Sequence, residues 1–230
     1  MMSDEIQKLR NGVIVLCHAE KDEPFNSPQH IAAFARAAEM GGAAGIRVQG
    51  FDNIKAVRSA VGLPVIGISK GSYVDGWVLV TPDVADVDNI IEAGADIVAL
   101  DVTHRVRPNG MDGFQFLEVI RRRYEIPLIA DVSTYEEGIR AAELGADAVA
   151  TTLSGYTQYT EESADEFPDF NLIERLTSEV RIPVIAEGRI WSPSEAAHAM
   201  KCGAFALVVG SAVTRPRIIT QRFVETVKNL

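Results

Sequence analysis

The stretch EAGADIVALD, residues 92–101, carries the two signals that decide the fold. Gly94 stands where a helix would end in a left-handed cap, and the apolar run DIVALD that follows has the composition of a buried strand. The pattern recurs in EMGGA at 39–43, ELGAD at 143–147 and KCGAF at 201–205, with Gly41, Gly145 and Gly203 in the capping position. The irregular intervals, roughly 50 to 60 residues, favour a repeated βαβα module over a solenoid.

Apolar runs of the same kind occur along the whole chain and predict eight strands. The first, GVIVLCHA at 12–19, is rich in β-branched residues and lacks helical spacing. The other seven lie at 45–49, 64–69, 96–101, 127–132, 147–153, 183–188 and 206–210. A ninth patch, WVLVT at 77–81, follows the third strand so closely that we interpret it as part of the loop after that strand.

Helix-start signals lie between these strands. Ser27-Pro28 and Ser192-Pro193 each place a capping residue before a proline, and Thr134 with Glu137 fits a capping box. Alternating strands and helices without a linker predict a single-domain (β/α)₈ barrel, a TIM barrel of the α/β class, over residues 1–230. The alternative, an open doubly wound sheet, is less favoured because no glycine-rich dinucleotide fingerprint follows the first strand.

Composition excludes several classes of protein. The 230 residues include 22 Lys and Arg against 32 Asp and Glu, a net charge of −10, which argues against a nucleic-acid partner. No apolar stretch is long enough to cross a membrane, and the charged start MMSDEIQKLR does not resemble a secretory signal. Two cysteines make neither a disulfide framework nor a zinc site. We therefore expect a cytoplasmic protein.

The strand ends of such a barrel should hold the chemistry. Lys70, after the third strand, is the natural base if burial lowers its pKa; the alternatives are a solvated lysine or a pair with Asp101. Glu187, after the seventh strand, is the matching acid or base, unless it only pairs with Arg47 or Arg189.

The remaining strand-end residues are candidates for binding substrate. We expect contacts from His18, Arg47, Asp131 and Thr152, although Asp131 could instead accept hydrogen bonds from loop amides. The last two strand ends form a candidate phosphate site, built from Gly188, Arg189, Gly210, Ser211 and Arg215. The alternative for the glycines is that they only permit tight turns.

Two further expectations concern metals and a lid. The histidines, at 18, 30, 104 and 198, lack ligand spacing, so we expect no metal and no cofactor. The irregular segment 154–168 follows the sixth strand and is a candidate lid over the pocket; a disordered insertion is the alternative.

Several segments together resemble the N-acetylmannosamine-6-phosphate 2-epimerase family nearly end to end. They are NGVIVLC at 11–17, GGAAGIRVQG at 41–50, LPVIGISK at 63–70, TTLSGYT at 151–157, PVIAEGRIWSP at 183–193 and ALVVGSAVTRP at 206–216. The resemblance implies a metal-free enzyme of amino-sugar (sialic acid) catabolism that interconverts N-acetylmannosamine 6-phosphate and N-acetylglucosamine 6-phosphate.

The resemblance also implies residue roles. Lys70 would remove and return the proton at carbon 2, and Glu187 would serve ring opening or the partner proton transfer. Arg47 would contact the sugar and Arg215 the phosphate. His18 is a departure, because glutamine usually follows the first-strand cysteine in the family.

Other functions remain open at this stage. A metal-dependent ribulose-phosphate-type epimerase also uses a phosphate-binding barrel, but the arrangement of histidines and aspartates that its metal would need is missing. A lysine Schiff-base aldolase acting on another sugar phosphate is a second alternative. A non-catalytic sugar-phosphate sensor is a third, disfavoured because a binding protein has no need of a base such as Lys70. We also expect a homodimer, because barrels of this size commonly dimerise through outer helices. The C-terminal helix has an apolar side, formed by Ile218, Ile219, Phe223 and Val227, that could pack on its own barrel or on a partner.

Overall fold

The computed structural model describes residues 2–72, 78–161 and 167–229. The barrel strands are β1 (Val13–Cys17), β2 (Gly45–Gln49), β3 (Val65–Ile68), β6 (Ile97–Asp101), β7 (Leu128–Asp131), β8 (Ala148–Ala150), β9 (Val184–Glu187) and β10 (Ala206–Val209). They form a closed barrel in the order β1-β10-β9-β8-β7-β6-β3-β2, and every neighbouring pair is parallel. The predicted (β/α)₈ fold is confirmed.

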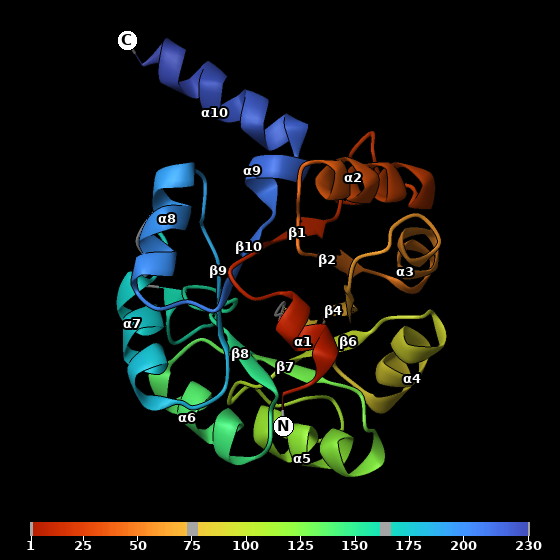
Figure 1. The fold of residues 1–230 in the computed structure, drawn as a ribbon, viewed down its shortest axis with the longest axis vertical. Helices are drawn as coiled ribbons and strands as arrows, with labels where there is room; N and C mark the ends of the chain where they lie inside the picture. Colours follow the sequence, from red (N-terminus) through yellow and green to blue (C-terminus); the bar gives the residue numbers. More distant parts are fainter. Residues whose placement is uncertain (1, 73–77, 162–166, 230) are drawn as a thin grey trace.

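Helices surround the barrel and close one of its ends (Figure 1). The outer ring consists of α2 (Pro28–Met40), α3 (Phe51–Arg58), α4 (Val84–Glu92), α5 (Gly113–Arg123), α6 (Tyr135–Glu143), α7 (Phe170–Glu179) and α8 (Pro193–Lys201). The short α1 (Asp4–Lys8) packs Ile6 and the following Leu9 against the barrel interior. The chain ends in α9 (Ser211–Thr214) and α10 (Pro216–Lys228).

Side-chain alternation along the strands creates two apolar layers. Ile14, Ile66 and Ile97 belong to the cluster inside the barrel, whereas their neighbours Val15 and Val65 belong to the layer between strands and helices. Because both faces are buried, each strand reads as a continuous apolar run, which explains why the sequence reveals the strands. The interior cluster fills the barrel, so polar chemistry is left to its ends.

The predicted caps are largely found. The side chains of Ser27, Thr134 and Ser192 each accept the backbone N–H of the third helical residue, and Thr134 and Ser192 both belong to capping boxes. Gly94, Gly145 and Gly203 have φ of 94°, 91° and 94°. The prediction for Gly41 was wrong: its φ is −78°, and the left-handed residue is Gly42, with φ 88°.

Two segments differ from the sequence prediction. Residues 77–81, interpreted as loop, contain β5 (Val78–Val80), which pairs antiparallel with β4 (Lys70–Ser72) outside the barrel. Lys70 therefore begins a hairpin strand that pairs Lys70 with Val80. Residues 154–161 of the predicted lid form a series of turns, while 162–166 lie outside the described residues.

The C-terminal α10 extends away from the barrel (Figure 1). None of its residues is buried, and the side chains of Phe223 and Val227 are 71% and 69% exposed. Ile218 and Ile219 at the start of the helix are half-buried, so only the later part of its apolar side, with Phe223 and Val227, is left unpacked on its own barrel. No helix among the described residues has the length and apolar character needed to span a membrane.

Candidate functional site

A cavity of about 480 Å³ opens at the carboxyl ends of the strands. Ten of the eleven predicted site residues line it: His18, Arg47, Lys70, Thr152, Glu187, Gly188, Arg189, Gly210, Ser211 and Arg215. The eleventh, Asp131, is fully buried and pairs with Arg47. The structure thus brings all eleven residues to one end of the barrel.

The floor of the cavity is a buried ionic cluster around Arg47. Its Nη1 and Nη2 donate to the two carboxylate oxygens of Asp131, at 3.0 and 2.5 Å, and Nη1 also donates to Glu187 Oε2 at 3.0 Å. The hydroxyl of Thr152 lies 2.7 Å from Asp131 Oδ1 and 3.1 Å from Glu187 Oε2. Asp131 accepts from these side chains, not from the loop amides that were the alternative.

One carboxyl of this cluster, that of Glu187, has a raised pKa. Burial raises the pKa of Glu187 to about 7, and the charge of Asp131 acts in the same direction, against the opposing effect of Arg47. Of the two carboxylates that share Arg47, Asp131 takes the bidentate contact, so Glu187 is the one disposed to carry a proton. A carboxyl with a pKa near 7 can act as acid or base at neutral pH.

Lys70 faces the same cavity from the start of the β4–β5 hairpin. Burial lowers its pKa; the carboxylate of Glu20 opposes this shift, while Arg47 and Arg215 add to it. A larger fraction of Lys70 is therefore neutral than for a free lysine, as a general base requires. The alternative pairing with Asp101 is not found, because Asp101 binds Arg105 at 2.5 Å.

His18 lies at the cavity wall with 8% of its surface exposed. Burial lowers its pKa to about 4, and the charges of Lys70 and Arg215 act in the same direction. The imidazole is thus neutral at pH 7. Its buried Nδ1 has no hydrogen-bond partner within the described part of the chain, so a ligand oxygen or N–H at this point would satisfy it.

The predicted phosphate residues gather at the ends of β9 and β10. Gly188 has φ 111°, and Gly210 is the N-cap of α9, so each presents backbone at the rim without a side chain. Arg215 is bound to Glu23 at 2.8 Å, and the pKa of Glu23 is lowered to about 2 chiefly by that hydrogen bond. Arg189 donates to the carbonyls of Phe167 and Ser154 at 2.8 and 2.6 Å.

The polar and aromatic residues that line the cavity beyond the predicted ones are Glu20, Arg105, Tyr156 and Trp191. Tyr156 lies in the segment predicted as a lid, and the other three were missed from the sequence. Arg105 and Asp101 are both buried, and their contact spans the loop after β6. An aspartate that ends an apolar strand, followed four residues later by arginine, is a usable signal for such a pair. Among residues 2–72, 78–161 and 167–229 no group of three or more His, Cys, Asp or Glu side chains could hold a metal ion.

Comparison with known proteins gives a consistent family. A family model described as "Putative N-acetylmannosamine-6-phosphate epimerase" matches residues 31–229. A protein from Caldanaerobacter subterraneus named "Putative N-acetylmannosamine-6-phosphate 2-epimerase" is 51% identical over 99% of this chain and 96% of its own. One of the same name from Clostridioides difficile is 43% identical over 97% and 99% of the two chains.

Solved structures are similar as well. The N-acetylmannosamine-6-phosphate 2-epimerase from Clostridium perfringens superimposes with a TM-score of 0.90 at 40% identity, covering 97% of this chain and 96% of that one. A thiamine phosphate pyrophosphorylase from Pyrococcus furiosus has a TM-score of 0.64 at 20% identity, with 92% and 90% covered, and shares the fold alone.

Proposed function

The chain belongs to the N-acetylmannosamine-6-phosphate epimerase family, and on that premise we propose that it interconverts N-acetylmannosamine 6-phosphate and N-acetylglucosamine 6-phosphate. The observation that carries the proposal is the placement of Lys70 and Glu187 in one cavity, each with its pKa shifted toward neutrality. Amino-sugar catabolism in the cytoplasm is the setting that such substrates imply.

The reaction requires a carbon–hydrogen bond that is acidic enough to lose its proton to a base. In the open-chain sugar, carbon 2 lies next to the aldehyde, so loss of its proton gives an enolate whose charge rests on oxygen 1. The neutral amine of Lys70 takes that proton and becomes an ammonium. Return of a proton to the opposite face of carbon 2 then gives the other epimer, with no net change in atoms or electrons.

The cluster beneath Lys70 supplies the remaining steps. Protonated Glu187 donates to the ring oxygen as the carbon 1–ring oxygen bond breaks, while the hydroxyl proton on oxygen 1 is lost to water; ring closure reverses both proton transfers. Arg47, held rigid by the bidentate contact with Asp131, places a fixed positive charge near the developing enolate. Thr152 and the neutral His18 hydrogen-bond the sugar and fix its orientation.

The phosphate is anchored away from the reacting carbon. Backbone amides around Gly188, Gly210 and Ser211 surround it, with positive charge from Arg215. Because Glu20 and Glu23 occupy Arg215 in the structure, phosphate competes with these carboxylates for its guanidinium. Arg189 contributes chiefly by holding the loop after β8 through its bonds to the carbonyls of Ser154 and Phe167.

We also propose that the enzyme is a homodimer formed through α10. That thirteen-residue helix has no fully buried residue, and its apolar side chains Phe223, Val224 and Val227 are exposed, whereas Ile218 and Ile219 at its start are half-buried. An unpartnered apolar face of this kind is typical of an association surface. A second copy of the chain is the natural occupant, since each copy contributes the same helix.

The activity is tested by incubating either epimer with the protein and following the approach to one common equilibrium ratio. We expect conversion in both directions, and Lys70→Ala should lower kcat at least about 100-fold, the usual contribution of a general base. Trapping of the substrate by borohydride on Lys70 would indicate a Schiff-base aldolase instead. Binding of both sugars without turnover would indicate a sensor.

A further inference from the structure

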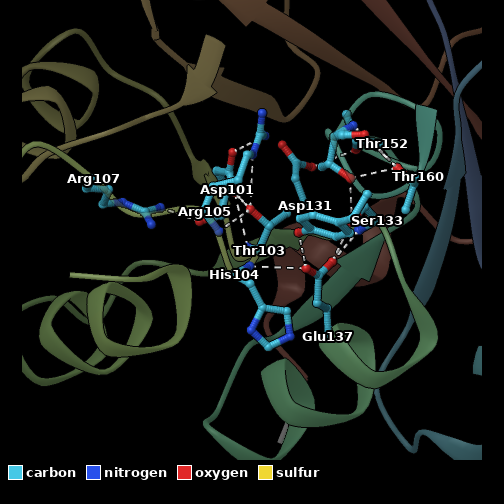
Figure 2. Close-up of polar contacts among 12 residues, drawn as sticks. Asp101, Thr103, His104, Arg105, Arg107, Asp131, Ser133, Glu137, Thr152 and Thr160 are labelled. Carbon is cyan, nitrogen blue, oxygen red and sulfur yellow. Dashed lines mark hydrogen bonds and ion pairs between the residues drawn. The ribbon is translucent and has the colours of Figure 1, made fainter. Parts of the chain in front are cut away.

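The buried carboxylate of Glu137 joins three loops above the barrel. From the sequence, Glu137 is expected to act as the capping-box partner of Thr134. In the structure it is fully buried, and Figure 2 shows it between the loops after β6 and β7. Its Oε2 accepts the backbone N–H groups of Ser133 and Thr134 at 2.7 and 3.1 Å and the Ser133 hydroxyl at 2.8 Å.

The other carboxylate oxygen reaches beyond this helix. Glu137 Oε1 accepts the backbone N–H of His104 at 3.1 Å, from the loop after β6. The same atom accepts the hydroxyl of Tyr159 at 2.5 Å, from the loop after β8. A helix cap requires neither bond. For comparison, the capping-box Glu195 of α8 receives its bonds from Ser192 and Trp191, in the entry to its own helix.

Of the three loops that Glu137 joins, those after β6 and β8 carry cavity-lining side chains. His104 immediately precedes Arg105, and Tyr159 follows Tyr156 by three residues; Arg105 and Tyr156 both line the cavity. The turn that contains Tyr156 is tied together by the bond from the backbone N–H of Gly155 to Thr160 Oγ1 and by the contact of Thr157 Oγ1 with Ser133 Oγ at 3.4 Å. A shift of Tyr159 would therefore move the turn that carries Tyr156.

We propose that Glu137 is a positioning residue, whose single carboxylate aligns Arg105 and Tyr156 across the substrate pocket. The inference rests on the proposed function for the identity of the substrate. Hydrogen bonds to an ionised acceptor are short and strong, and a shared acceptor makes the order of one loop depend on the other. Because Arg105 and Tyr156 line the cavity but are not the proposed acid and base, Lys70 and Glu187, we expect loss of the alignment to weaken binding and to leave the chemical step intact.

The direct test removes one bond and keeps the fold. Tyr159→Phe deletes the tyrosine hydroxyl that donates to Glu137 Oε1. Tyr124→Phe is the matched control, because the Tyr124 hydroxyl donates to Asp88 at the same distance of 2.5 Å on the outer surface. We expect Tyr159→Phe to raise KM for N-acetylmannosamine 6-phosphate three- to tenfold with kcat within twofold. Tyr124→Phe should change neither. An unchanged KM, or equal falls in kcat for both variants, would overturn the proposal.

A second measurement does not depend on turnover. Hydrogen–deuterium exchange should accelerate at residues 153–161 in Tyr159→Phe, and at both 103–107 and 153–161 in Glu137→Gln. Glu195→Gln, which alters a capping box without these cross-loop bonds, should leave both segments unchanged. If Glu137→Gln affects only its own helix start, Glu137 is a cap and the proposal fails. A wild-type protein without epimerase activity would refute the proposed function, and the exchange result would then decide the role of Glu137.

Discussion

Two carboxylates that share one arginine behave differently because their surroundings differ. Asp131 is fully buried and receives both terminal nitrogens of Arg47, whereas Glu187 receives only one and reaches the cavity. Burial and the neighbouring charge of Asp131 then favour the protonated form of Glu187. The cluster thus supplies a fixed positive charge on Arg47 and a proton donor, Glu187.

The pH dependence of catalysis should report Glu187. With a pKa of about 7, the carboxyl carries a proton below that pH and loses it above, so its capacity to donate declines as pH rises through 7. We expect an inflection near pH 7 in kcat/KM of the wild type that is absent in Glu187→Gln. The amide keeps an acceptor oxygen for Arg47. If the inflection persists in the variant, Glu187 is only an ion-pair partner.

His18 should make the protein sensitive to acid. Its folded pKa of about 4 lies below the usual 6.5, so the unfolded chain binds the proton first as pH falls. The stability present above pH 6.5 is lost progressively toward pH 4, by up to about 3 kcal/mol. Glu187 titrates in part of this window with opposite sign, since its raised pKa makes the folded state gain stability as pH falls from 7 to 4.5.

Comparison with a variant isolates the contribution of His18. Between pH 7 and pH 5, we expect His18→Gln to lose less stability than the wild type in urea unfolding, because glutamine has no proton to take up. Equal losses in the two proteins would mean that His18 is not held neutral in the folded state.

At the scale of elements, the loops after the strands depend on close packing of the helices that follow. Gly113 begins α5 directly against the loop that leads to Arg105: its N–H donates to the Thr103 carbonyl at 2.9 Å. A Cβ at this position would lie 2.5 Å from the backbone N and O of Thr103. The small residue therefore lets α5 support the arginine-bearing loop.

Gly113→Ala should destabilise the fold. The clash is with backbone, so relief requires a shift of α5 or of the loop, at a cost of about 1–3 kcal/mol. Urea unfolding should show this loss. Gly62→Ala is the control, because the nearest atom to its added Cβ is Glu39 Oε1 at 3.6 Å. Equal stability of the two variants would contradict the close packing of α5.

The exposed α10 gives a prediction about assembly. Phe223→Ser combined with Val227→Ser should convert the proposed dimer to a monomer, measured by sedimentation. Because these side chains are 71% and 69% exposed within one chain, unfolding of the isolated barrel should change little. A wild-type protein that sediments as a monomer, or a variant that remains dimeric, would contradict association through this helix.

At the scale of the whole molecule, strands buried on both faces made the barrel predictable. Continuous apolar runs marked β1, β2 and the rest, and glycine caps such as Gly94 marked the helix ends. Strand-end position then brought Lys70, Glu187 and Arg47 into one site. The hairpin of β4 and β5 was missed because its strands are only three residues long and their pairing is local to one loop.

Residues whose position depends on tertiary partners could not be predicted in the same way. Arg105 reaches the cavity because Asp101 binds it, and the fivefold acceptor role of Glu137 depends on His104 and Tyr159, which approach from other loops. The direction of α10 is another case, since its amphipathic pattern is compatible with packing on its own barrel or away from it. Periodicity indicates that a face is apolar and leaves its partner open.

Proton transfer at carbon 2 is the step on which the proposed activity depends, and proton NMR of N-acetylmannosamine 6-phosphate with the protein in D₂O observes it. We expect N-acetylglucosamine 6-phosphate to appear carrying deuterium at carbon 2, and Lys70→Ala to abolish both the conversion and the exchange. If the sugar phosphate binds but neither conversion nor exchange occurs, the protein does not transfer a proton at carbon 2.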